Sequence, residues 1–175
     1  MTSEYLHECF TYDQETGTLR WKEDRPLAHF ADEKGRNIWR GRFAGKVTGT
    51  ESNGYLLVWV LGKLVRAHRI AWIMSHGDIP SGMQIDHIDQ NKINNRLSNL
   101  RLATRSQNNH NTGITSRNTS GAKGVCFHKQ TGKWMARIHH NGRAIHLGMF
   151  KDIEEAASAR ADAVSKYHGE FAPVN

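Results

Sequence analysis

The sequence has little of what stabilises secreted or membrane proteins. Two cysteines occur among its 175 residues, Cys9 and Cys126, and they form neither a CxxC pair nor a metal-type spacing. Two reduced thiols are the simpler interpretation, because cytosolic proteins rarely keep disulfides. The N-terminus has no basic stretch followed by an apolar one, and the longest apolar run, 55–61, is too short to span a bilayer. We therefore expect a cytoplasmic protein without a membrane partner.

Negative charge is also scarce. The chain has 24 Lys and Arg against 17 Asp and Glu, which gives a net charge of +7, and its eleven histidines add positive charge below neutral pH. This balance favours a polyanionic partner, most simply a nucleic acid, although a basic protein without such a partner is the alternative. A hydrophobic content of 38% suffices for small cores, which indicates one ordinary domain or two small ones.

The first part of the chain is predicted to form short elements joined by polar loops. A helix near the N-terminus could be capped by Ser3, and a hairpin turning at Thr16-Gly17 would follow it. Residues 22–46 are polar and contain glycine, so we predict a long loop in which Trp39 and Phe43 are isolated anchors. Its basic residues either contact phosphates or form a solvated surface. These residues are Lys34, Arg36, Arg40, Arg42 and Lys46.

A second hairpin and a helix come next. Strands over 55–61 and 64–67 flank a predicted turn at Gly62-Lys63. The segment 68–76 has the apolar spacing of a helix and ends at Gly77, a good C-terminal stop. His68 lies at the start of this helix. As a lone histidine it is interpreted as structural or as a phosphate contact rather than as a metal ligand.

The segment 84–111 carries far more Asn, Asp and His than a core segment does. It reads QIDHIDQNKINNRLSNLRLATRSQNNHN. We predict a short strand over 83–87, an asparagine-rich loop over 88–99 and a second strand over 100–103. Thr104 is a good N-cap for a helix that would extend to about Asn111.

This order of elements resembles the ββα-metal fold of the HNH endonucleases, and in particular the phage and intron-encoded homing enzymes. The resemblance covers about residues 64–112. Asp86-His87 match the family's metal ligand and general base on the first strand. Asn99 matches the middle asparagine, whose side chain braces the loop, and Asn108 matches the helix residue that completes the metal site. The resemblance therefore implies His87 and Asn99 as catalytic residues and Asp86 and Asn108 as metal ligands.

These residues also fit the chemistry of phosphodiester hydrolysis. Neighbours on a strand point to opposite faces, so Asp86 can face a metal while His87 faces a water. A neutral imidazole can act as a general base at physiological pH. Asp86 and Asn108 offer oxygen atoms, which suit Mg²⁺ or Mn²⁺ better than Zn²⁺. We expect one such ion per active site and no small-molecule cofactor.

Other polar residues of this segment have less specific interpretations. Arg101 and Arg105 are predicted phosphate clamps, with surface salt bridges as the alternative. His110 is interpreted as a surface histidine and Asp89 as a hydrogen-bonding loop residue. Turn-forming roles are predicted for Asn91, Asn94 and Asn95.

The tail follows a small, polar linker at 112–121. It is predicted to contain three short strands, with turns at 130–132 and Asn141-Gly142, and an alanine-rich helix over 153–169. The words SGAKGV, GKWMARI, LGMF, EEAASARADA and HGEFAPVN resemble the APETALA and ethylene-response-factor (AP2/ERF) DNA-binding domain over about 118–175. That resemblance implies a sheet that enters the major groove. The candidate DNA contacts are Lys133, Arg137, His139, Arg143 and His146.

The charge of the tail agrees with a DNA-binding role. Nine basic minus five acidic residues give +4 over 113–175. The alternative is a small sheet-and-helix module for other interactions. Within the tail, alternation places Val125, Phe127 and Ala136 on one face of the sheet and Arg137 and His146 on the other.

Together these features predict an α+β protein with four parts. They are an N-terminal extension rich in β-hairpins (1–53), an HNH nuclease domain (54–111), the linker (112–121) and an AP2/ERF-like domain (122–175) made of a three-stranded antiparallel sheet and one packed helix. The predicted function is metal-dependent, site-directed cleavage of double-stranded DNA in a bacterial host by a phage or mobile-element enzyme. One site per chain predicts a monomer that nicks one strand, and a dimer could break both. The alternatives are a DNA-binding regulator without cleavage activity and a non-specific or RNA-directed nuclease.

Overall fold

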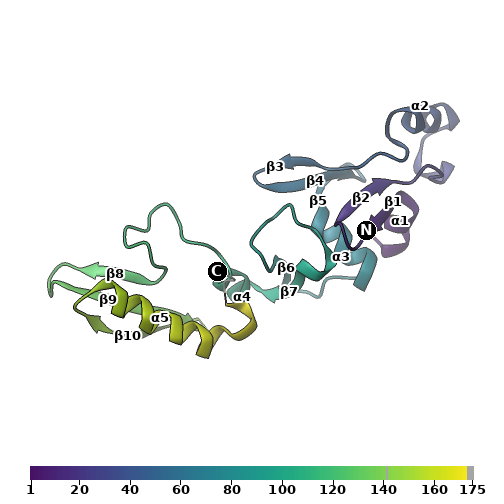
Figure 1. Cartoon of the computed structure of the whole chain (residues 1–175). Coiled ribbons are helices and arrows are strands. Elements are labelled where there is room, and N and C mark those ends of the chain that lie inside the picture. The colour runs from purple at the N-terminus through teal and green to yellow at the C-terminus, as the bar shows by residue number, and fades with distance from the viewer. Residues whose placement is uncertain (141, 173–175) are drawn as a thin grey trace. The chain divides into compact units, whose positions relative to one another are not determined.

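A computed structural model describes residues 1–140 and 142–172, and it confirms the α+β class. The chain divides into two units. The first comprises Met1–His87 and Asn91–Leu102, and the second comprises Ile88–Gln90 and Ala103–Asn175. The division falls within the nuclease segment, so the unit boundaries differ from the predicted domain boundaries. Figure 1 labels the elements of both units.

The first unit consists of two hairpin-like sheets, three α-helices and the strands of the nuclease segment. Sheet β1-β2 has two strands, sheet β3-β4-β5 has three, and all the pairings within these two sheets are antiparallel. In chain order, the elements of the first unit are α1 (Ser3–Cys9), β1 (Phe10–Asp13), β2 (Thr18–Trp21), the 3₁₀ turn η1 (Leu27–His29), α2 (Glu33–Phe43), β3 (Thr50–Ser52), β4 (Tyr55–Val60), β5 (Lys63–Arg66), α3 (Ala67–His76), β6 (Met83–His87), η2 (Leu97–Asn99) and most of β7 (Leu100–Thr104).

The N-terminal residues share their core with the middle of the chain. Leu6, Cys9, Phe10 and Leu19 pack in one cluster with β4 and α3, through Val58, Val60, Ala67, Ile70 and Ile73. A second, smaller cluster attaches β6 and β7 to α3 through Ala71, Trp72, Ile85 and Leu100. Residues 1–53 therefore do not form a core of their own, and they support the helix against which the nuclease strands pack.

Two local predictions in this unit need small corrections. The N-cap of α1 is Thr2, whose hydroxyl accepts from Tyr5 N, whereas Ser3 Oγ donates to the Ile73 carbonyl. The turn between β4 and β5 is Leu61-Gly62, one residue earlier than predicted. Both turn residues have positive φ, 50° and 72°, and this backbone matches the twist of the two strands.

The predicted long loop over 22–46 is wrong, because it contains α2. Asp32 caps the helix by accepting from Gly35 N, but no residue of α2 is buried, so the segment has no apolar periodicity that would predict it. The helix is held by its rings and by a cation. Trp39 packs edge to face on Trp21 at 5.5 Å, and the Arg25 guanidinium lies within 5.0 Å of both ring centroids. Tertiary aromatic packing thus overrides weak local propensity.

The second unit is a three-stranded antiparallel sheet covered by one helix, as predicted. The strand order is β10-β9-β8, and the yellow helix α5 lies along this sheet in Figure 1. Buried Val125, Ala136 and Ala156 form its core, but Phe127 is exposed although it was predicted on the apolar face. Residue 141, in the predicted second turn, lies outside the described residues. The elements are α4 (Arg105–His110), β8 (Val125–His128), β9 (Lys133–His140), β10 (Arg143–Phe150), α5 (Ile153–His168) and η3 (Gly169–Phe171).

Among the described residues, no helix is both long and apolar enough to cross a membrane.

Gly17 connects the first hairpin to the nuclease segment. Its φ is 74°, and a Cβ added there would lie 2.5 Å from Arg96 N and 2.6 Å from the Asn95 carbonyl carbon. Since backbone atoms cannot move aside as a flexible side chain can, the hairpin turn and residues 95–96 can approach this closely only with glycine.

Gly17→Ala should therefore destabilise the first unit more than a matched glycine change. Gly62→Ala is the control, because Gly62 has a similar φ of 72° and nothing within 4 Å of its added Cβ. The control should lose about 1–2 kcal/mol for the left-handed backbone. The free energy of unfolding measured in urea should fall clearly more in Gly17→Ala. Equal losses in the two variants would contradict the close contact between Gly17 and the backbone of residues 95–96.

Candidate active site

The candidate site is built on β6, whose last two residues are Asp86 and His87. Both residues are only 5% exposed, and Ile85 anchors the strand in the smaller core cluster. The two side chains have different partners, an arginine for Asp86 and an asparagine for His87. The strand therefore buries a carboxylate and an imidazole side by side, which is costly unless each has a partner.

His87 is held by Asn95. The distance from His87 Nε2 to Asn95 Oδ1 is 3.1 Å, and the contact is buried. An amide oxygen can only accept, so Nε2 carries the proton and Nδ1 is the basic nitrogen of the neutral ring. Asn95 is itself 1% exposed, and its carbonyl accepts from the Tyr12 hydroxyl at 2.7 Å. The tautomer and the direction of the imidazole are thus set by a fully buried residue that the sequence suggested was a turn former.

Asn99 braces the loop that carries Asn95. Asn99 Nδ2 donates to the Asn94 carbonyl at 2.8 Å, from the short 3₁₀ turn that precedes β7. The backbone N–H of Leu97 donates to the Gln14 carbonyl in the first hairpin. These bonds give the loop 91–99 fixed backbone partners, although it contains no strand or α-helix.

Asp86 forms an ion pair with Arg101 on the neighbouring strand β7. Arg101 Nε and Nη2 lie 2.9 and 2.8 Å from Asp86 Oδ2. The side chains are only 14% and 6% exposed, so this is a buried pair and not the surface salt bridge considered as an alternative. The guanidinium of Arg101 compensates the carboxylate inside the unit, and its predicted contact with DNA stays a prediction.

His68 is the residue that the sequence interpretation underestimated most. Its ring meets the His87 ring edge to face, with centroids 4.8 Å apart, and Tyr55 lies 5.5 Å from it. Burial, helped by the charges of His87, Arg66 and Arg69, lowers the pKa of His68 to about 3. The His68 ring is therefore neutral at physiological pH and packs against the His87 ring. A signal for this was present, because Ala71 and Trp72, three and four residues along α3, are on the buried face.

Asn108 lies on α4, which belongs to the second unit, while Asp86, His87 and Asn99 belong to the first. Thr104 caps α4 in a full capping box with Gln107, as expected for the N-cap, and Arg105 is exposed at its first turn. No group of three His, Cys, Asp or Glu side chains suited to a metal occurs within residues 1–140 and 142–172. A metal site at Asp86 must therefore use amide oxygens, water or substrate as its other ligands.

The candidate DNA contacts of the tail are all exposed, but they do not share one face. Arg137 and His146 lie directly opposite one another in the β9–β10 register, and alternation places Lys133 and His139 on the same face. Arg143 pairs with His140, which places it on the other face of the sheet. The sheet thus presents four of the five candidates together.

Comparison with known proteins identifies the nuclease segment. A family model described as HNH endonuclease matches residues 65–110. Protein 3.8 of Escherichia phage T7 is 36% identical over 110 residues, which are 63% of this chain and 90% of that protein. The chain belongs to the HNH endonuclease family.

Two further similarities extend over more of this HNH protein. An uncharacterised HNH endonuclease of Acanthamoeba polyphaga mimivirus is 35% identical over 123 residues, 70% of this chain and 63% of the relative. A solved structure of DNA binding and cleavage by the HNH homing endonuclease I-HmuI aligns with a TM-score of 0.37 and 20% identity over 90% of this chain and 82% of that one. The family match includes His68, Asp86, His87, Asn95, Asn99 and Asn108. It does not reach the tail.

His68 should make the first unit of this HNH protein less stable in acid. An unfolded imidazole titrates near pH 6.5, and the folded one only near 3, so the unfolded state binds the proton first. The stability contributed by neutral His68 is complete above about pH 6.5 and is lost as the pH falls toward 3. His68→Gln should reduce the slope of unfolding free energy between pH 7 and 5 by up to about 1.4 kcal/mol per pH unit.

The control for this titration is His76→Gln, an exposed histidine of the same helix. Urea unfolding followed by tryptophan fluorescence at several pH values gives both slopes. An unchanged slope in His68→Gln would show that His68 is not kept neutral by the fold.

Proposed function

We propose that this protein is a divalent-metal-dependent, site-directed DNA endonuclease of the homing type, which hydrolyses phosphodiester bonds and nicks one strand per monomer. The observation that carries the proposal is the buried bond between His87 Nε2 and Asn95 Oδ1, next to Asp86, within the segment matched by the HNH family model. An imidazole aligned by an acceptor is the arrangement that a general base needs.

His87 is the proposed general base. Its Nδ1 would take the proton from the attacking water, and the ring would then carry a positive charge. The Asn95 oxygen accepts from the opposite ring nitrogen, so it stabilises that charge and keeps the ring oriented. The neighbouring ring of His68 remains neutral and does not compete for the proton.

HNH nucleases typically depend on a divalent metal, and the donor chemistry of Asp86 fits one. The carboxylate of Asp86 and the amide oxygen of Asn108 are hard ligands of the kind Mg²⁺ and Mn²⁺ prefer. A bound ion would stabilise the charge that develops on the phosphate and the 3′ leaving oxygen. Because Arg101 bonds Asp86 Oδ2, the carboxylate would be shared between the ion and the guanidinium, which keeps Asp86 aligned but lowers its affinity for the ion.

The tail is proposed to bind duplex DNA as an AP2/ERF-like module, with Lys133, Arg137, His139, Arg143 and His146 as contacts. Arg105, on α4 of the nuclease segment, is proposed as a separate phosphate contact. The exposed basic face of β9 and β10 supports this role. The same face would serve a regulator that binds without cleaving, but such a protein has no need of an aligned His87. Similarity to a T7 protein supports action in the cytoplasm of a bacterial host, encoded by a phage.

Cleavage by His87 can be tested with supercoiled plasmid. In Mg²⁺ the wild type should produce open circles, EDTA should stop the reaction, and His87→Ala should lower the rate about 10²–10⁴-fold while DNA binding persists. Asn95→Ala should give an intermediate rate, since the base would remain but lose its alignment. Immediate linear product would indicate a dimer, and equal rates in wild type and His87→Ala would refute the base.

DNA binding by the sheet can be tested separately by gel retardation. Lys133→Ala and His146→Ala should weaken binding to duplex DNA, and Lys133→Ala should also reduce the salt slope by about one. Lys166→Ala is the control for lost charge, because Lys166 lies on α5 and is exposed there. If the control weakened binding as much as Lys133→Ala, the effect would be net charge and not contact by this face.

A further inference from the structure

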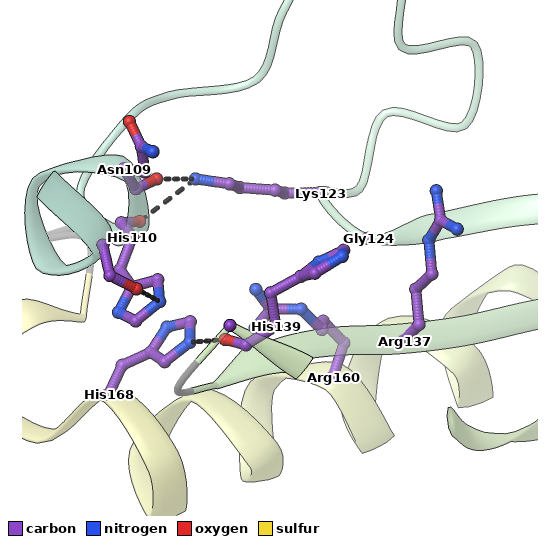
Figure 2. A pocket seen from close by; sticks show the side chains of 10 residues that line it. Asn109, His110, Lys123, Gly124, Arg137, His139, Arg160 and His168 are labelled. Carbon is purple, nitrogen blue, oxygen red and sulfur yellow. Dashed lines mark hydrogen bonds between the residues drawn. The ribbon is translucent and has the colours of Figure 1, made fainter. Parts of the chain in front are cut away.

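A cationic cavity of about 460 Å³ lies within the second unit, between α4, the start of β8, β9 and α5. Figure 2 shows the side chains that line it. Lys123 and Arg160 contribute positive charges, Arg137 borders the cavity next to Gly124, and His110, His139 and His168 contribute imidazoles. No described residue lining the cavity is an aspartate or a glutamate. The described ion pairs also involve none of its cations.

Arg160 is the residue that needs an explanation. It projects from α5, is only 8% exposed, and its Nε and Nη1 have no hydrogen-bond partner among the described residues. Burial lowers the pKa of its guanidinium, which has no carboxylate to offset the loss of water. A buried guanidinium with two unpaired nitrogens is unfavourable, so these nitrogens call for a partner that a ligand can supply.

The walls around Arg160 are closely fitted. A Cβ on Gly124, whose φ is 76°, would lie 2.8 Å from Arg160 Nε and 2.5 Å from the Arg137 carbonyl oxygen. The guanidinium therefore rests against backbone that only glycine leaves open. This contact fixes Arg160 in place and makes its donors a preorganised fork.

The remaining wall is held by Lys123 and His168. Lys123 Nζ donates to the carbonyls of Asn109 and His110 at 3.1 and 3.0 Å, so it caps the end of α4 while adding its charge to the cavity. His168 Nε2 donates to the His139 carbonyl at 3.0 Å, and its ring stacks on His110 with centroids 3.7 Å apart. Figure 2 shows the bonds of Lys123 at the end of α4 and the bond of His168, on α5, to His139, on β9.

We propose that this cavity binds a phosphate group, with Arg160 as its main ligand and Lys123 as a supporting charge. A tetrahedral oxyanion matches several N–H donors at once, and the lack of acidic groups in the lining favours an anion over a cation. The phosphate can belong to the DNA backbone or be a free ion. The DNA source rests on the proposed function, whereas binding of free phosphate does not.

The test compares the full-length wild type with Arg160→Met and with Arg117→Met. A methionine side chain is similar in length to that of arginine but carries no charge. The Arg160→Met variant therefore loses a buried charge and should fold with an unchanged or higher Tm in the absence of phosphate. Arg117 is an exposed arginine of the same unit and serves as the matched control. Thermal unfolding is followed while inorganic phosphate replaces chloride at constant ionic strength.

Phosphate should raise the Tm of the wild type and of Arg117→Met, and Arg160→Met should need at least about tenfold more phosphate for the same rise. Arg160→Lys keeps the charge without the fork, so it should retain part of the response. Equal responses in wild type and Arg160→Met, or none in either, would overturn the proposal.

Duplex DNA identifies the source of the phosphate. If the cavity takes a backbone phosphate, Arg160→Met should bind DNA more weakly and its salt slope should fall by about 0.9. If DNA binding is unchanged while the phosphate response is lost, the ligand is free phosphate. A wild type that responds to phosphate but never cleaves DNA would refute the endonuclease and leave this site intact.

Discussion

The position of His87 depends on one buried amide. Asn95 accepts from the His87 ring through Oδ1 and from the Tyr12 hydroxyl through its carbonyl, and Gly17 lies against its carbonyl carbon. These contacts join the asparagine-rich loop, which carries Asn95, to the first hairpin through Tyr12 and Gly17 and to β6 through His87. Buried polar groups tolerate few arrangements, because a displaced partner leaves a donor or an acceptor unpaired. The positions of the loop, the first hairpin and the His87 imidazole therefore depend on one another.

The elements of the nuclease segment could be predicted because their signals are local. The strand 83–87 matches β6, and the capping box of Thr104 and Gln107 begins α4 where the threonine indicated. The elements of the tail could also be predicted, because apolar and polar residues alternate along its strands and its helix is rich in alanine. The helix α2 could not be predicted in this way. It buries no residue, and its packing comes from contacts of Trp39 with Trp21 and Phe30, which lie outside the helix.

The contacts within the site were less predictable than the identities of its residues. The residue types at 86, 87 and 99 suggested a metal ligand, a base and a brace, and these roles stay proposals. Which asparagine holds His87 depends on how the loop folds back, so Asn95 could not be separated from its neighbours Asn91 and Asn94. Arg101 likewise has the same chemistry toward a phosphate and toward Asp86, and only the pairing of β6 with β7 brings it to the carboxylate.

The packing of α2 has a consequence for spectroscopy. Trp21 and Trp39 meet at 85° with centroids 5.5 Å apart, and the Arg25 guanidinium lies 4.7 Å from the Trp39 ring. Two indoles this close and rigid couple their electronic transitions, and a nearby cation shifts their energies. The circular dichroism and fluorescence of the intact protein should therefore depend on the contact of α2 with Trp21 and Arg25. A change in these signals would therefore report the loss of contact between α2 and Trp21, separately from any change at His87.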